Sequence, residues 1–416
     1  MASLLDTLGE LIGTTWKHRE VTRRHSRTFT CRCGNHVFFR NTTCLKCQSP
    51  LGYLPAEAKL LPLDPGPEAG TWRAEGVATL QKCCGNRDTP AGCNWLVPTD
   101  DPHTLCIACR LNRTIPNLED PDNARYWSLI EGAKRRLVSE LLALGLPVKS
   151  KVDEDQERGL MFDLLRSPAQ GPRVMTGHAQ GLITLNVEEA DDSSRERIRL
   201  EMHEPYRTLL GHFRHEVGHY YWDRLVLDTP WLDRFRELFG DERADYAAAL
   251  RVNYENGPPS DWRDRFISAY ASTHPWEDWA ETWAHYLHMI DSLGTALGFG
   301  LEAADLETTI EPFARDALYA PEDQGASRFL SLVNSWIELT MVLNELARSM
   351  AVRTREELAP AFADIKQAGS QAIYVIDDPI FFTHRMTFLE LAAAAGLPTI
   401  HGVLVGNVGL VRQCPP

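Results

Sequence analysis

The stretch GHFRHEVGHYYWDRL (residues 211–225) places two histidines four residues apart, with a glutamate directly after the first. On a helix, His215 and His219 stand on one face about a turn apart, so both imidazoles can bind one metal ion. Glu216 lies beside them, where its carboxylate can take a proton from a water at that metal. His212 precedes the motif, and we interpret it as a solvated histidine. Two histidines leave a zinc site without a third protein ligand, which another part of the chain must supply.

A Trp-rich segment about sixty residues later, ASTHPWEDWAETWAHYLHMI (271–290), offers that ligand. Pro275 fits the first turn of a helix, and Glu277 one turn in can reach the metal. Glu281, four residues further on the same face, can accept the free N–H of a ligand histidine and so orient it. Asp223 is a second candidate for that role, and the small Ala280 allows the two helices to approach closely. The alternative for the two glutamates is a solvent-facing acidic stripe.

Nine of the ten cysteines lie between Cys31 and Cys109, in two groups. Closely spaced thiols at the tips of turns can converge on one tetrahedral zinc ion. Four thiolates fill the tetrahedron, so the groups predict up to two structural zinc ions rather than catalytic ones. The alternative is that the cysteines are simply buried. The predicted ligands are Cys31, Cys33, Cys44 and Cys47 for the first zinc and Cys84, Cys93, Cys106 and Cys109 for the second, with Cys83 as the spare thiol.

Composition limits the classes of function. The chain has 416 residues, of which 44% are hydrophobic and 24% charged, a mix typical of globular proteins. A formal net charge of −14 argues against a general binder of nucleic acid or of an anionic membrane. The basic stretch 17–27 favours a nucleic-acid contact, but apolar residues at helical spacing over 3–16 favour an amphipathic helix with a charged continuation. With no signal peptide visible and with cysteines in metal-ligand spacing, we expect a cytoplasmic protein.

Changes in residue pattern along the sequence divide the chain into four regions. Residues 1–27 predict a helical extension, 28–117 a zinc-ribbon module, and 118–349 a mainly helical domain with a strand at 182–187. Residues 350–416 alternate between helix and strand as one β-α-β unit, which cannot cover both faces of its sheet. We therefore interpret that region as a fragment without activity of its own, rather than as a functional module. Its apolar run at 391–411 is broken by Gly396 and Pro398, which favours a strand–turn–strand over a membrane span.

These motifs resemble known families. His215-Glu216-x-x-His219 followed by Glu277-x-x-Ala280-Glu281 resembles the gluzincin metallopeptidases, the thermolysin-like group. The order CRCGN…CLKC, CNWLVP…CIACRLNRTIP, TGHAQGLITLN and HPWEDWAETWAHYLH resembles bacterial zinc-binding metallopeptidases with an N-terminal zinc ribbon, over roughly residues 28–348. Residues from about 350 to 402 resemble a piece of an ABC-transporter substrate-binding protein.

The resemblance implies roles for particular residues. His215, His219 and Glu277 would hold a catalytic zinc, and Glu216 would be the general base. The strand before the active-site helix would be an edge strand that holds a peptide substrate by β-augmentation. A Tyr or His near the zinc would stabilise the oxyanion. The strand residues are Leu182, Ile183, Thr184, Leu185 and Asn186, and the oxyanion candidates, which spacing does not separate, are Tyr270, His274, His285 and His288.

We therefore predict an α+β fold: a zinc-ribbon module, a mainly helical gluzincin-like domain with a small sheet, and a C-terminal β-α-β fragment. The predicted function is a zinc-dependent hydrolase, in first place a peptidase acting on a peptide or protein. The alternative is a non-enzymatic zinc protein whose ribbons bind a protein or nucleic-acid partner and whose histidine site is a relic. Glu216 discriminates between the two, because a purely structural site needs no carboxylate there.

Overall fold

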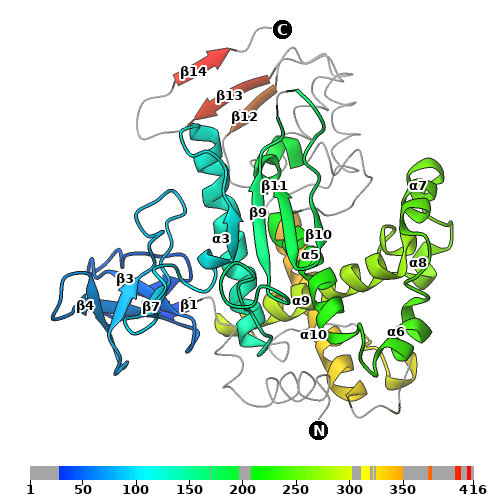
Figure 1. Ribbon diagram of the computed structural model, residues 1–416, viewed down its shortest axis with the longest axis horizontal. Coiled ribbons are helices and arrows are strands. Elements are labelled where there is room, and N and C mark those ends of the chain that lie inside the picture. The colour runs from blue at the N-terminus through cyan, green and yellow to red at the C-terminus, as the bar shows by residue number, and fades with distance from the viewer. Residues whose placement is uncertain are drawn as a thin grey trace. The chain divides into compact units, whose positions relative to one another are not determined.

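The computed structural model describes residues 28–168, 170–195, 208–301, 311–318, 322, 325–349, 373–376, 399–403 and 410–413. Within these residues the chain is a mixed helix and sheet protein of the predicted α+β class (Figure 1). The predicted helical extension at 1–27 falls outside the described residues. No helix of the described part is both long enough and apolar enough to cross a membrane.

Short antiparallel strands build the N-terminal ribbon region, drawn in blue in Figure 1. One hairpin pairs β1 (Thr28–Thr30) with β2 (His36–Phe38). Leu54, Leu63, Ala74 and Leu96 form the small core of a second, five-stranded sheet. A core of this size needs reinforcement, which the cysteine groups can provide by binding metal. That sheet runs in chain order through β3 (Leu51–Leu54), β4 (Lys59–Pro65), β5 (Thr71–Ala74), β6 (Gln81–Cys83) and β7 (Leu96–Pro98).

Another sheet, of four strands, lies in the helical part of the chain, with its strands in the order β10-β11-β9-β8. Strands β8 (Asn112–Thr114) and β11 (Leu182–Asn186) both run parallel to β9 (Met161–Leu165), and β10 (Gly177–Ala179) is antiparallel to β11. The predicted strand at 182–187 therefore exists, but its predicted place at the edge of the sheet is wrong. The turn at Gln180 and Gly181, both with positive φ, folds β10 back along the outer side of β11. Within the described residues, β10 is the edge strand on that side.

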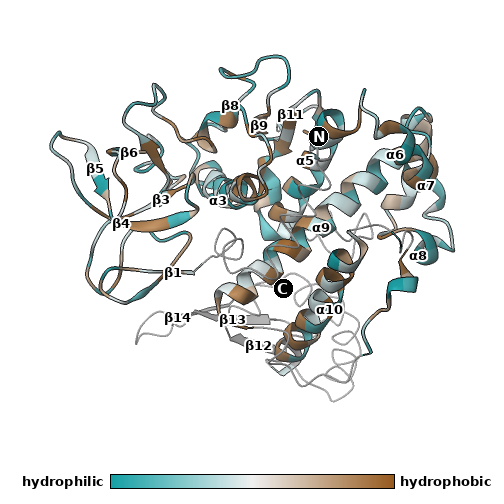
Figure 2. Ribbon diagram, turned by 90° about the horizontal axis from the view of Figure 1, so that it is seen from below, coloured by the Kyte–Doolittle hydropathy of each residue, from teal (hydrophilic) through white to brown (hydrophobic). Residues whose placement is uncertain are grey.

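The longer helices have clear local signals. Helix α3 (Pro121–Ala143) begins with a proline after the capping residue Asp120, whose side chain accepts a hydrogen bond from Asp122 N–H. Helix α9 (Pro275–Gly298) also begins with a proline, and along it Figure 2 shows apolar and polar residues in alternation, as in an amphipathic helix. The other α-helices are α5 (Leu209–Leu225), α6 (Leu232–Phe239), α7 (Tyr246–Asn256), α8 (Trp262–Arg265) and α10 (Ala326–Ser349).

Buried charges hold α3, α5 and α9 together. Arg214 of α5 donates to Glu140 of α3 at 2.7 Å and to Asp291 of α9 at 2.9 Å. Arg136 of α3 donates to the same Asp291 oxygen at 2.7 Å. Because Arg214, Glu140 and Asp291 are almost fully buried, loss of one partner would leave an uncompensated charge in the core. This network places the helix that carries His215 firmly against its two neighbours.

The region 350–416 consists, in its described residues, of three strands. Strands β12 (Ile373–Ile376) and β13 (Thr399–Val403) are parallel, as the β-α-β pattern predicts, while the intervening segment lies outside the described residues. Strand β14 (Leu410–Gln413) pairs antiparallel with β13. Two of the three strands of this sheet are adjacent in sequence, which matches the strand–turn–strand interpretation of the apolar run.

Candidate metal centre

The two motif segments meet because small residues line the contact between α5 and α9. A Cβ on Gly218, inside the His-Glu-x-x-His motif, would lie 3.0 Å from the Cα of Ala280 and 3.3 Å from the side chain of Trp283. A larger residue at 218 would push the helices apart. Helix α5 begins at the capping residue Thr208, whose hydroxyl accepts from Gly211 N–H at 3.0 Å. The close approach carries Glu277 of α9 to the face of α5 that bears the histidines.

His215, His219 and Glu277 converge, with ligand atoms within 4.8 Å of one another. The two Nε2 atoms are 3.2 Å apart, and Glu277 Oε2 is 3.1 Å from His215 Nε2. Ligand atoms at zinc–nitrogen distances of about 2.0–2.1 Å in a tetrahedron lie about 3.3 Å from each other. The three side chains therefore stand at the separations that a shared zinc ion requires.

Glu277 supplies a second test of the fit. Its Oε2 atom is buried and makes no hydrogen bond of good geometry, although His215 Nε2 lies 3.1 Å away, and its side chain is only 1% exposed. A buried carboxylate oxygen without a donor is costly, and a cation between the three ligands would compensate it. Burial raises the pKa of Glu277, but the adjacent His215 and His219 lower it to about 2, so the carboxylate is ionised. The donor set fits Zn²⁺.

Hydrogen bonds from neighbouring side chains orient His215 and Glu277. Glu281 Oε1 lies 2.7 Å from Nδ1 of His215, the contact expected of a residue that leaves Nε2 free for a metal. Ser268 in turn donates to the other oxygen of Glu281 at 2.7 Å. Tyr246 of α7 donates to Glu277 Oε1 at 2.6 Å. The sequence offered no signal for Tyr246 or Ser268, since neither belongs to a motif or lies at a helical spacing from one.

Glu216 is buried, with 4% of its surface exposed, and it contacts His212, which the sequence predicts to be solvated. His212 is not a solvated histidine: its Nε2 lies 3.2 Å from Glu216 Oε1 and its side chain is 14% exposed. Burial raises the pKa of Glu216, but the contact with His212 and the nearby histidines lower it below its ordinary value. Glu216 is thus ionised near neutral pH, the form that a general base requires.

The other candidates are distributed unevenly around the site. The ring of Tyr270 lies 6.0 Å from that of His215, whereas His274 caps α9 and His288 packs on Trp336. His285 Nδ1 is 2.8 Å from the Glu281 carbonyl oxygen. In the described part of the chain Asp223, the second candidate for orienting a ligand, makes no hydrogen bond to either ligand histidine.

A residue of the edge strand also reaches the site. The ring of His178, on β10, stacks on that of His219 with centroids 6.2 Å apart and an angle of 11° between the planes. Gly181 N–H donates to His178 Nε2 at 2.9 Å. Burial lowers the pKa of His178 to about 4, so the imidazole is neutral. His178 lies in the segment TGHAQG (176–181), which the sequence pattern did not connect with the histidine motif.

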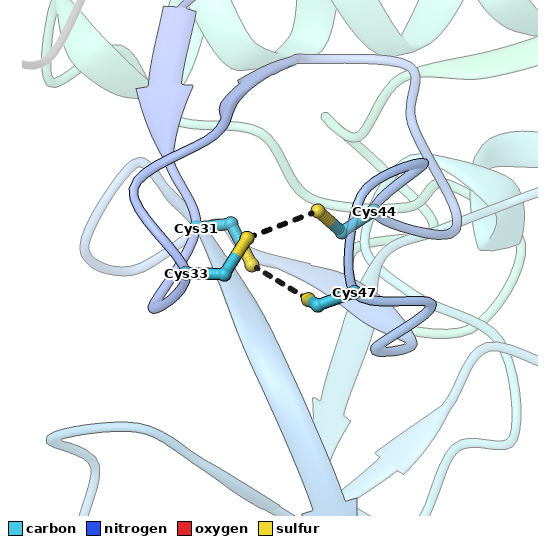
Figure 3. Close-up of side chains that lie close together, drawn as sticks. All are labelled: Cys31, Cys33, Cys44 and Cys47. Carbon is cyan, nitrogen blue, oxygen red and sulfur yellow. Dashed lines mark hydrogen bonds between the residues drawn. The ribbon is translucent and has the colours of Figure 1, made fainter.

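The first cysteine cluster, formed by Cys31, Cys33, Cys44 and Cys47, is drawn in Figure 3. The Sγ atoms of Cys31 and Cys47 are 3.6 Å apart, and those of Cys33 and Cys44 are 3.7 Å apart. Thiolates about 2.3 Å from a tetrahedral zinc lie about 3.8 Å from each other, so the spacing fits that ion. Hydrogen bonding with Ser49 lowers the pKa of Cys47 to about 6, which favours the thiolate. Cys47 is exposed and Cys33 is half-buried.

The second cysteine cluster, formed by Cys84, Cys93, Cys106 and Cys109, is buried at all four positions. The Sγ atoms of Cys93 and Cys106 are 3.7 Å apart, and Cys106 N–H donates to Cys84 Sγ at 3.3 Å. Cys83 is not part of the group, as the sequence predicts. The four ligand atoms of each cluster lie within 4.8 Å of one another. Within the described residues, these two clusters and the His-His-Glu group are the candidate metal sites.

Comparison with known proteins places these sites in a family context. Residues 123–360 match the family described as "putative zinc-binding metallo-peptidase", and residues 28–120 match a zinc-ribbon domain. The first match covers more than half of the chain and includes all three ligands of the His-His-Glu group. The chain belongs to this family. The family descriptions include zinc binding, and the geometry of the clusters also indicates it.

Three similar relatives come from mycobacteria. An uncharacterized protein of Mycobacterium bovis and two of Mycobacterium tuberculosis strains are each 44% identical to this chain over 326 residues. The aligned part covers 78% of this chain and 88% of each relative. No solved structure matches the chain significantly.

Proposed function

We propose that the protein is a zinc-dependent metallopeptidase of the gluzincin type, with His215, His219 and Glu277 as ligands of one catalytic zinc. The observation that supports this most is the unsatisfied, buried Oε2 of Glu277 facing two imidazoles. An ion pair between Glu277 and His215 would not explain why a second ionised carboxylate, that of Glu216, lies beside the two histidines. A structural zinc site would need four ligands and no base, whereas this site offers three ligands and a base.

The chemistry follows from the positions of these groups. When bound, zinc supplies Lewis-acid chemistry, which makes water acidic enough to be a nucleophile near neutral pH and polarises a carbonyl. Glu216 accepts the proton of the attacking water and passes it to the amine that leaves. Glu281 holds the ring of His215 in the orientation that a ligand needs. The products are a carboxylic acid and an amine, so water is the only co-reactant.

Two further roles belong to the same proposal. Strand β10, rather than β11, would hold a peptide or protein substrate by β-augmentation, because β10 is the edge strand and carries His178 next to His219. Tyr270 would donate to the oxyanion, because its ring lies close to His215 and burial raises its pKa well above the usual value, so the phenol keeps its proton. Substitution of Tyr270 by Phe would then lower kcat.

Each of the two cysteine clusters would hold one structural zinc ion. With the catalytic zinc, each chain would then bind three zinc ions. Eight of the ten cysteines in such clusters suit a reducing compartment, and we propose the cytoplasm. The residues that we assign to this chemistry all precede residue 350, and the resemblance of residues from about 350 to 402 to a piece of a substrate-binding protein adds no activity to the proposal.

The proposal is tested by Glu216→Gln, which is nearly isosteric and leaves the ligands in place. With an internally quenched, randomised peptide library at neutral pH, wild type should cleave, and Glu216→Gln should be about a hundredfold slower or worse. His215→Ala should lose one zinc of three in metal analysis. Cleavage by wild type and Glu216→Gln at equal rates would identify a contaminating protease. No cleavage by wild type with three zinc ions bound would favour the non-enzymatic zinc protein.

A further inference from the structure

A chain of hydrogen bonds runs from the edge of the four-stranded sheet to Glu216. His212 lies one helical turn before Glu216, with Nε2 3.2 Å from Glu216 Oε1. On the other side of the ring, Nδ1 is 2.6 Å from Glu189 Oε2. Glu189, in the short 3-10 helix Val187–Ala190 after β11, is 3% exposed. Thr176, directly before β10, donates to Glu189 Oε1 at 2.6 Å.

The arrangement differs from a packed histidine because both ring nitrogens face carboxylates. A carboxylate accepts hydrogen bonds, so an imidazole between two of them donates from both nitrogens when it carries two protons. Such charge-assisted hydrogen bonds are short and directional. The ring of His212 is therefore held at both ends, and the Glu216 carboxylate is held by one oxygen.

The anchor of this chain is itself well fixed. Thr176 Oγ1 also accepts from Asn186 N–H at 3.1 Å, so the hydroxyl that holds Glu189 is tied to the last residue of β11. Asn186 in turn donates from its side chain to Val174 O at 3.1 Å. The sheet that ends in β10 thus supports Glu189, and through His212 it supports a residue of α5.

We propose that Glu189 and His212 are a positioning pair for Glu216, which fixes the orientation of its carboxylate toward the water that the metal site binds. The inference rests on the proposed function, because it assigns a device to the base of that reaction. It parallels the action of Glu281 on His215: one carboxylate orients the ligand, and Glu189, acting through an imidazole, orients the base. A general base held in one orientation transfers a proton more efficiently than a rotating one.

The test compares two substitutions of His212. His212→Leu removes both hydrogen bonds, while His212→Gln retains an N–H that can donate to Glu216. With a quenched peptide from the randomised library that wild type cleaves, kcat of His212→Leu should fall about 10–100-fold. KM and the zinc content should not change, and His212→Gln should recover much of the loss. His36→Gln, at an exposed position on β2, is the control and should match wild type. An unchanged kcat in His212→Leu would overturn the inference and leave the proposed function intact.

A second measurement is independent of activity. In protein labelled with ¹⁵N at histidine, the Nδ1–H of His212 should give a far-downfield proton resonance, because it donates to a carboxylate at 2.6 Å. The resonance should vanish in His212→Gln and move upfield in Glu189→Gln, whose amide oxygen is a weaker acceptor. If Glu189→Gln leaves every such resonance in place, the pair does not exist. If the resonances behave as expected but wild type cleaves nothing, the proposed function fails and the positioning role falls with it.

Discussion

Each of the two cysteine clusters consists of four cysteines, but the surroundings of the two clusters are very different. The first lies at the tips of turns, with Cys47 exposed and Cys33 half-buried. The second is buried at every position and lies against helix α3, where Glu131 Oε2 is 3.7 Å from Cys109 Sγ. A thiolate cluster carries net negative charge when it binds zinc, so burial of the second cluster must be compensated by the protein around it.

Helix α3 provides that surrounding structure. Lys134 pairs with Glu131 at 2.6 Å, and both side chains are fully buried. Arg135 donates to the carbonyl oxygen of Ala91 at 2.9 Å, directly linking α3 to the loop that carries Cys93. The first cluster instead has small polar neighbours such as Ser49, 3.3 Å from Cys47 Sγ. The second cluster is therefore part of the helical domain's core, whereas the first reinforces a hairpin.

The largest effect is expected from Cys106→Ser. This change removes one ligand of the buried cluster, and structural zinc binding contributes on the order of 10 kcal/mol or more to small zinc domains. We expect loss of soluble, cooperatively folded protein, measured by size-exclusion chromatography and circular dichroism. Cys83→Ser is the matched control, because Cys83 lies outside the cluster, and it should leave zinc content and folding unchanged. A folded Cys106→Ser protein with one zinc fewer would show that the two clusters are equivalent.

The next largest effect is expected from Lys134→Met. It removes the positively charged partner of the fully buried Glu131, a loss that costs about 3–5 kcal/mol. Urea denaturation should report that loss in the free energy of unfolding, and Lys59→Met should not. Lys59 pairs with Glu57 at the surface, where an ion pair contributes about 0–1 kcal/mol. Similar stability of the two variants would mean that α3 does not depend on the charges next to the second cluster.

A smaller effect is expected from Cys47→Ser. One zinc should be lost, because three thiolates and a hydroxyl hold the ion poorly, but the helical signal in circular dichroism should stay as in wild type. The reason is that the exposed cluster supports a hairpin and not the helices. Metal analysis and circular dichroism on the same sample give both quantities. A large loss of helix would contradict the difference between the clusters.

The smallest effect is expected from Thr28→Val. The Thr28 hydroxyl donates to the carbonyl oxygen of Gly298, at the end of α9, at 3.0 Å. This part-buried hydrogen bond ties the hairpin of the first cluster to the helical domain, and its loss should cost about 1 kcal/mol. Differential scanning calorimetry would measure the change, with the zinc content as the control. A loss as large as that of Lys134→Met would show that the hairpin is also integral to the core.

Local sequence signals predicted much of the candidate site. A helix brings residues four apart to one face, so the spacing of His215 and His219, and of Glu277 and Glu281, follows from helical geometry alone. The cysteine spacings similarly predict which thiols gather. Pro275 marks the start of α9 by its missing N–H. Each of these signals operates within one turn or one hairpin, where chain geometry leaves few alternatives.

The mistaken interpretations share a different property. Treating His212 as solvated failed because its partner Glu189 lies 23 residues earlier, in another element. The strand predicted at 182–187 was placed at the edge on the resemblance to gluzincins, since periodicity identifies a strand but does not give its neighbours, and here β10 borders it. Tyr246 bonds to Glu277 across 31 residues. In each instance the contact is long-range, and no local pattern encodes it.

Local sequence patterns therefore identify which residues could ligate a metal, on which kinds of element they stand, and that a glutamate accompanies the two histidines. Tertiary packing, in contrast, determines which strand borders the site, what holds Glu216, and why one cysteine cluster is fully buried and the other partly exposed. The physical reason is that donor type and helical spacing are local properties of the chain. Burial and hydrogen-bond partners depend on segments far apart in sequence, which the packing of α3, α5, α9 and the small sheet brings together.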